Sequence, residues 1–119
     1  MDVNRMIARL KEHRGSSSMG MIAFHLGIVR ATSRKGNDVG AVEVSYDYDS
    51  IANIIKDIKS MRGIIEVLVE TNEGRLMVGD EILAVAVAGD IREHVFPALE
   101  RAVDRIKVEA SQKKEFLNP

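Results

Sequence analysis

The run from Glu81 to Ala88 constrains the fold most, because seven of its eight residues are apolar and no polar face remains. A strand with one face in water alternates apolar and polar residues, whereas a strand covered on both faces does not. The run therefore predicts a central strand with packing on both sides. Gly89-Asp90 ends it, and we expect Asp90 to cap the helix that follows.

Helical spacing of apolar residues predicts a small amphipathic helix over Asp2 to Arg14. We expect it to cover one face of a sheet, with a partner-binding arm as the alternative. Gly15 to Ser18 then breaks the pattern and predicts a short flexible connector. We therefore divide the chain into residues 1–17, an N-terminal helix with its Ser-rich connector, and residues 18–119, the main domain.

Two further helices are expected in the main domain. Asp49-Ser50 supplies an N-cap for the first of them, which ends near Gly63. The last helix carries its apolar stripe from Val95 onward and runs at least to Lys107.

Four further segments predict strands. Met19 to Val29 is an apolar stretch, Val42 to Tyr48 alternates with period two, Ile64 to Val69 is β-rich, and Arg75 to Met77 forms a very short strand. An exposed loop, Thr32 to Asp38, separates the first two. The order of elements predicts an α+β fold, with helices on one side of a largely antiparallel sheet.

The composition excludes several functional classes. With 119 residues, 45% of them apolar and 29% charged, the chain has the profile of an ordinary folded domain. Its cysteine count is zero, which excludes a disulfide framework, a thiolate metal site and a thiol nucleophile. We expect neither a metal nor a cofactor. We also expect a cytoplasmic protein, since no apolar run approaches the roughly 20 residues of a bilayer span and the first residues lack the signal-peptide order.

The charge balance argues against a nucleic-acid partner or a membrane surface. The formal net charge is -1, so no overall positive field would attract a polyanion. A nucleic-acid-binding domain that uses Arg30, Arg34 and Lys35 together with the C-terminal lysines is one alternative, but the chain has few aromatic side chains for base stacking.

Four cationic residues are the candidates for binding an anion. Lys107 and Lys114 are seven residues apart, close to two helical turns, so on a continuous helix both point the same way about 10 Å apart. Arg30 follows a buried strand, and Arg92 lies where the central strand passes into the last helix. Lysines at a helix C-terminus are also commonly solvated there, where they favour the helix dipole.

The three histidines, His13, His25 and His94, lack metal-ligand spacing with acidic residues. We expect them to be surface or structural residues.

Several segments, taken in order, resemble the large, catalytic subunit of molybdopterin synthase. They resemble its F-x-G-x-V-R strand end (with one more residue between the Phe and the Gly), its next strand and helix, its G-x-L-x-V-G-[DE] turn, its H-R-x-x-A-F segment and its D-x-[LI]-K with W-K-[KR]-E. In this chain they are Phe24 to Arg30, Val42 to Tyr48, Gly74 to Asp80, Arg92 with Phe96, and Asp104 to Lys107 followed by Lys113 to Glu115.

This resemblance implies an α/β-hammerhead fold, a homodimer, and a small ubiquitin-like sulfur-carrier subunit with a Gly-Gly C-terminus as partner. The carrier's thiocarboxylate would deliver sulfur to cyclic pyranopterin monophosphate in molybdenum cofactor biosynthesis. Lys107 and Lys114 would be catalytic, the first as an acid/base or covalent amine and the second by stabilising charge. Arg30 and Arg92 would bind substrate.

The chain also departs from the family pattern. Ile91 stands where the family has the His before Arg92, and Thr71-Asn72 replaces a His-Arg pair. Ser111 to Lys113 replaces a Pro-x-Trp, which favours a last helix that extends further. The alternative function is therefore a non-catalytic, carrier-binding or interaction module of the same fold.

Overall fold

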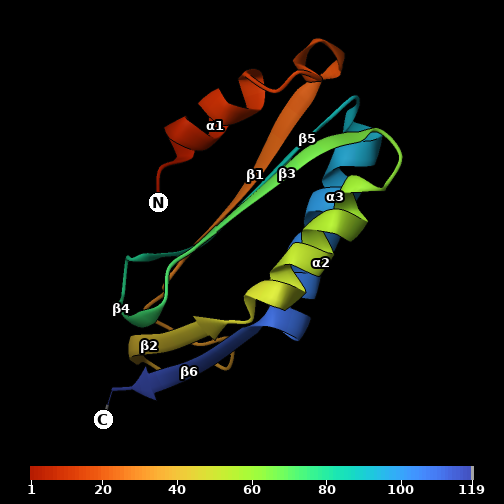
Figure 1. Cartoon of the computed structure of the whole chain (residues 1–119). Coiled ribbons are helices and arrows are strands. Elements are labelled where there is room, and N and C mark those ends of the chain that lie inside the picture. The colour runs from red at the N-terminus through yellow and green to blue at the C-terminus, as the bar shows by residue number, and fades with distance from the viewer. Residues whose placement is uncertain (119) are drawn as a thin grey trace.

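The computed structural model describes residues 1–118 and forms an elongated molecule of 52 × 25 × 24 Å (Figure 1). In chain order its elements are α1 (Val3–Lys11), the 3-10 helix η1 (Ser16–Ser18), β1 (Met21–Ile28), β2 (Val39–Tyr46), α2 (Tyr48–Lys59), β3 (Ile64–Thr71), β4 (Gly74–Met77), β5 (Glu81–Gly89), α3 (Arg92–Arg105), the π-helix η2 (Ile106–Ala110) and β6 (Ser111–Leu117).

The strands form two antiparallel three-stranded sheets. The larger has the order β1-β5-β3, so the strand predicted as central does lie in the middle. Residues 84 to 88 of β5 are fully buried, as expected for a strand covered on both faces. The α+β class is confirmed, although the strands divide into two sheets rather than one.

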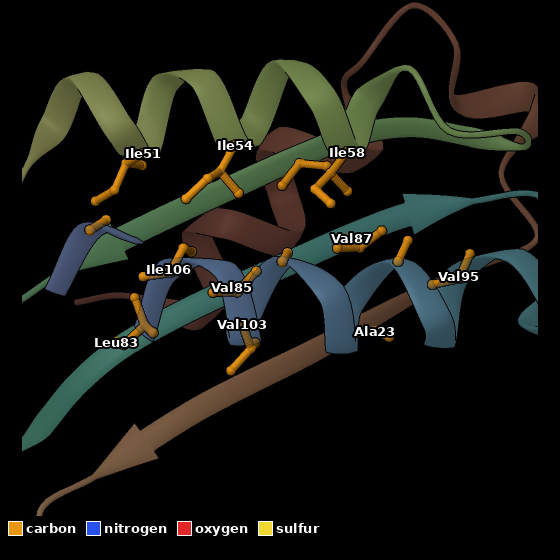
Figure 2. Close-up of a cluster of buried hydrophobic side chains, with 14 residues drawn as sticks. Ala23, Ile51, Ile54, Ile58, Leu83, Val85, Val87, Val95, Val103 and Ile106 are labelled. Carbon is orange, nitrogen blue, oxygen red and sulfur yellow. The ribbon is translucent and has the colours of Figure 1, made fainter. Parts of the chain in front are cut away.

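One face of the larger sheet packs against α2 and α3. Figure 2 shows Ile51, Ile54 and Ile58 of α2 pointing toward α3 and the sheet. Val95 and Ile106 meet them from the other side, and both are fully buried. Burial of each such side chain stabilises the fold by about 1.5–3 kcal/mol, so this layer fixes α3 and the segment after it.

The opposite face of the larger sheet packs against α1 (Figure 1). Met6 and Leu10 are buried there against the small side chains of Ala84, Ala86 and Ala88. The expectation that this helix covers a sheet face is confirmed. Because alanines line that face of β5, the helix can approach it closely, and helices cover both sides of the sheet rather than one.

The smaller sheet has the order β4-β2-β6, and β6 was not expected from the sequence. The regular part of the last helix ends at Arg105, and a π-helix of five residues carries Lys107. Lys114 then lies on a strand. The prediction that Lys107 and Lys114 share one helical face is therefore wrong.

Two expected helix caps are different in the structure. Asp47, not Asp49-Ser50, caps α2, and its carboxylate accepts hydrogen bonds from the backbone N–H groups of Asp49 and Ser50. Tyr48 accordingly begins the helix instead of continuing the strand. Asp90 does not cap α3, whose N-cap is Ile91 without a side-chain bond.

Asp90 instead organises a tight corner at the end of β5. Its Oδ1 lies 2.8 Å from Nδ1 of His94, and this hydrogen bond holds the pKa of the carboxyl below its ordinary value. Gly63 and Gly20 both pack so closely on Asp90 that neither position has room for a side chain. The Ser-rich connector before Gly20, expected to be flexible, forms the helical turn η1.

Within residues 1–118 no helix combines the length and the apolar character needed to cross a membrane.

Candidate functional site

A cavity of about 1030 Å³ opens where the end of β1, the smaller sheet and the π-helix meet. Val42, Val44 and Tyr46 of β2 form one wall, since alternate residues of a strand face the same side. Ile82 of β5 and Val108 of the π-helix contribute from the larger sheet and from α3's end. The cavity thus joins segments that are distant in the sequence.

Cationic side chains outnumber carboxylates around this cavity. The cations are Arg30, Arg34, Lys35, Lys107 and Lys113, and the carboxylates are Asp104 and Glu115. None of the five cations forms an ion pair with a carboxylate of residues 1–118. Cations without such partners attract anions into a concave site, where the field is concentrated.

Arg30 and Lys107, two of the four candidates from the sequence, lie on the same cavity. Arg30 follows β1 at the start of the exposed loop. Lys107 is held on the π-helix by the packing of Ile106 into the core. The structure therefore places a guanidinium and an ammonium that are far apart in the sequence on one cavity.

Arg92 and Lys114 do not line this cavity. Arg92 is on the first turn of α3, about 20 Å from Lys107 along the helix axis at 1.5 Å per residue. Its side chain is 78% exposed and donates to Glu93 at 3.1 Å. Lys114 lies on the outer face of the smaller sheet, with its Nζ 5.3 Å from the centre of the Phe116 ring.

His25 lines the cavity from β1, although the sequence indicated only a surface or structural role. Its Nε2 is buried and has no hydrogen-bond partner among residues 1–118. Burial, and secondarily the charge of Lys107, lowers the pKa of this imidazole below 6.5. His25 is therefore a neutral ring near the Lys107 cation. In the sequence, the one sign of its burial is its place on a mostly apolar strand.

Tyr46 is a second cavity residue that was not singled out as functional. Its hydroxyl donates to the backbone carbonyl of Ile82 at 3.2 Å and so connects the two sheets. Burial, followed by the effects of Tyr48 and Glu73, raises the pKa of Tyr46 to about 12. The phenol consequently stays protonated and neutral beside the cations.

The segment that carries Lys107 is fixed by an ion-pair network. Arg105 binds Glu109 through Nε at 2.6 Å and Nη2 at 2.9 Å, and binds Asp57 of α2 through Nη1 at 2.8 Å. The Oγ of Ser111 donates to the carbonyl of Lys107 at 3.2 Å. The backbone at Lys107 is thus held from both sides.

This arrangement suits the binding of an anion followed by proton transfer or charge stabilisation. Arginine holds phosphate or carboxylate oxygens through two parallel N–H bonds, and lysine acts as a point charge or a proton donor. Residues 1–118 contain no group of three or more histidines and carboxylates placed to hold a metal ion.

The chain is an α+β protein with helices packed on antiparallel sheets and a cation-rich cavity between its two sheets. A family model described as MoaE protein matches residues 1–109. The chain therefore belongs to the MoaE family, which confirms the resemblance to the large subunit of molybdopterin synthase.

Individual relatives agree with this assignment. The molybdopterin synthase catalytic subunit of Ralstonia nicotianae is 31% identical over 113 aligned residues, and the match covers 92% of this chain and 62% of the relative. The chain thus spans less than two thirds of that curated relative's length.

Solved structures show the same fold. Molybdopterin synthase from Staphylococcus aureus has a TM-score of 0.80 at 21% identity, covering 99% of this chain and 86% of that one. The molybdopterin biosynthesis MoaE protein from Burkholderia ambifaria has a TM-score of 0.79 at 26% identity, with 98% and 82% covered. A complex of subunits 1 and 2 of molybdopterin-converting factor from Helicobacter pylori has a TM-score of 0.74 at 14% identity, with 99% and 80% covered.

Proposed function

We propose that this chain is the catalytic subunit of a molybdopterin synthase and transfers sulfur from a thiocarboxylated carrier protein to cyclic pyranopterin monophosphate. The observation that carries the proposal is the meeting of Arg30 and Lys107 on one cation-rich cavity in a MoaE-family chain. Both reactants are anions, so a cavity with unpaired cations favours binding them side by side. The chain has no cysteine, so the sulfur has to arrive on a partner.

The partner in this proposal is a small ubiquitin-like protein that ends in Gly-Gly. A glycine tail has no side chains and can enter a narrow cavity in extended form. The Helicobacter pylori neighbour, which is a complex of two subunits of molybdopterin-converting factor, supports a two-subunit assembly. The tail's thiocarboxylate would then lie near Lys107.

The cavity residues have distinct roles in this proposal. Arg30 holds the substrate's phosphate through paired N–H bonds. Lys107 donates or accepts the proton, or stabilises the charge that develops as sulfur attacks. Tyr46, whose phenol stays neutral, and His25 exclude water from the inner wall.

We further propose a homodimer, because Arg92 does not line the cavity of its own chain. Arg92 can line such a cavity only in a second copy of the chain. Ile91 and Phe96 beside Arg92 are 47% and 55% exposed, which leaves an apolar surface next to the guanidinium. A dimer that covers this surface would place Arg92 against the partner copy.

The test is reconstitution of the reaction. The purified chain is mixed with the carrier in its thiocarboxylate form and with cyclic pyranopterin monophosphate, and molybdopterin is measured by mass spectrometry. Product formation that depends on the thiocarboxylate supports the proposal. Carrier binding without product would instead favour the non-catalytic module, and absence of both would overturn both functions.

A further inference from the structure

The imidazole of His25 is an exception to the hydrogen bonding of the rest of the chain. Among residues 1–118, its Nε2 is the one buried side-chain nitrogen or oxygen that has no hydrogen-bond partner. Buried polar groups in folded proteins are nearly always paired, so an unpaired group calls for a reason. His25 lines the same cavity as Lys107, and the exception therefore lies at the candidate site.

The alternation of side chains along β1 directs His25 toward the cavity. Ala23, two residues earlier, belongs to the core under α2 and α3, and Gly27, two residues later, lines the cavity. A Cβ added to Gly27 would lie 3.3 Å from Nε2 of His25 and 3.0 Å from Cγ2 of Ile82. The ring nitrogen therefore lies over Gly27, where the absence of a side chain leaves room for it.

The walls of the cavity around His25 differ in charge. Lys107 comes from the π-helix, and its charge acts on the imidazole. The lining residues of β5 are the apolar Ile82 and Leu83, and Tyr46 of β2 stays neutral. The other charged side chains of the cavity belong to the loop after β1, to α3 and to β6, and they are Arg30, Arg34, Lys35, Asp104, Lys113 and Glu115.

Three effects keep the ring of His25 neutral in the free chain. Burial lowers its pKa most, and the charge of Lys107 lowers it further. The buried Nε2 also has no acceptor among residues 1–118 for a second N–H. An anion bound beside Lys107 offsets the lysine's charge, and an anion with two negative charges exceeds it, which favours the imidazolium.

We propose that His25 is a further anion-binding residue of the cavity, neutral in the free chain, which takes up one proton when an oxyanion with two negative charges binds beside Lys107. The proton comes from solvent, goes to the ring nitrogen that lacks one, and returns to solvent when the anion leaves. No bond other than this N–H forms or breaks. This inference rests on the proposed function for the identity of the natural anion, a phosphate group, but proton uptake does not require sulfur transfer.

The coupling between proton and anion is reciprocal. If the anion favours the protonated ring, protonation of the ring strengthens anion binding by the same factor. The affinity for an anion that does not itself titrate is therefore expected to rise as the pH falls through the range in which His25 takes up its proton.

The first test measures the affinity for inorganic sulfate, which remains a dianion over the range used. Titration calorimetry at low salt is carried out at about pH 7.5 and about pH 5.5 on the wild-type chain and on His25→Phe, which keeps a ring but cannot take up a proton. The loss of affinity caused by His25→Phe is expected to be about fivefold larger at the lower pH. His13→Gln, which removes a histidine that does not line the cavity, serves as the control and should keep the wild-type pH dependence. Melting temperatures at both pH values establish that each variant is folded.

A second readout uses the wild-type chain alone. The Cε1–H signal of His25, assigned by its absence from His25→Phe, is followed by NMR as the pH is changed. The pKa of His25 is expected below 6.5 without sulfate, and saturating sulfate is expected to raise it.

The inference is overturned if the wild-type chain does not bind sulfate or if sulfate leaves the titration of His25 unchanged. An equal loss of affinity in His25→Phe at the two pH values, which a merely structural role would give, also overturns it. Proton uptake with sulfate but no molybdopterin formation would contradict the proposed function and leave this inference standing. Molybdopterin formation by a chain whose His25 does not respond to sulfate would do the reverse.

Discussion

The guanidinium of Arg105 binds both carboxylate oxygens of Glu109, and the backbone between these two residues carries Lys107. The same guanidinium reaches Asp57 on α2, so α2, α3 and the π-helix are joined at one point. This network raises the pKa of Arg105 and lowers that of Glu109, which means that both stay charged at neutral pH. The backbone that carries Lys107 is therefore held by a pair that does not line the cavity.

Glu109→Ala is predicted to slow sulfur transfer while it changes the melting temperature only slightly. The pair is exposed to solvent, where ion pairs contribute little to folding. A small displacement of a reacting group can nevertheless slow a reaction about 10- to 100-fold. The rate of molybdopterin formation and the melting temperature are measured for Glu109→Ala and for Glu100→Ala, an exposed glutamate of α3. Equal rates for the two variants would contradict a positioning role.

Stability is predicted to fall on mild acidification because of His25. The folded protein holds the pKa of this imidazole below 6.5, so between that lowered pKa and 6.5 it binds fewer protons than the unfolded chain. The stability that comes from burying His25 as a neutral ring is therefore complete above pH 6.5 and is lost as the pH falls below that value. Urea unfolding at about pH 7.5 and about pH 5.5 should show a smaller loss of stability for His25→Leu than for the wild-type chain. Identical losses would show that burial does not perturb His25.

Gly63→Ala is predicted to destabilise the fold strongly. Gly63 has a φ of 78°, and a Cβ there would collide with the Asp90 carboxylate and the His94 ring. Gly36 has a φ of 87° with open space around it, so Gly36→Ala meets only the backbone cost of about 1–2 kcal/mol. We expect Gly63→Ala to cost about 1–3 kcal/mol more by urea unfolding. Equal costs for the two variants would show that the corner around Asp90 yields without strain.

Leu10→Ala tests whether α1 is part of the core. Leu10 is 1% exposed and packs on the alanines of β5, so its truncation is predicted to cost about 2–5 kcal/mol. Arg9→Ala, on the exposed side of the same helix, serves as the control and should have little effect. A Leu10→Ala protein as stable as Arg9→Ala would favour the alternative, an N-terminal arm that binds a partner.

The elements with strong periodicity could be predicted from the sequence. The run of β5 is apolar on both faces, and α2 and α3 each have one apolar stripe. These patterns indicate which faces are buried, and the period of the buried positions indicates strand or helix. Caps were less predictable. Asp47 and Asp49 are both competent capping residues, and only the fold decides which one lies at the turn.

The site was predictable only in part, because its geometry depends on where the last helix ends. No proline or glycine between Ile106 and Ser111 signals the π-helix, and β6 forms through pairing with β2, which lies far away in the chain. Spacing alone therefore placed Lys107 and Lys114 on one helical face. Because side chains alternate along β6, Lys113 lines the cavity and Lys114 does not. Arg30 and Lys107 both line the cavity.

The most direct measurement of the central claim is the transfer of sulfur by Lys107→Ala. The variant is mixed with thiocarboxylated carrier and cyclic pyranopterin monophosphate under single-turnover conditions, after its melting temperature has been compared with that of the wild-type chain. Loss of an acid/base or charge-stabilising amine is predicted to slow product formation by at least about 100-fold in a folded protein that still binds the carrier. A folded Lys107→Ala chain that turns over at the wild-type rate would contradict the account.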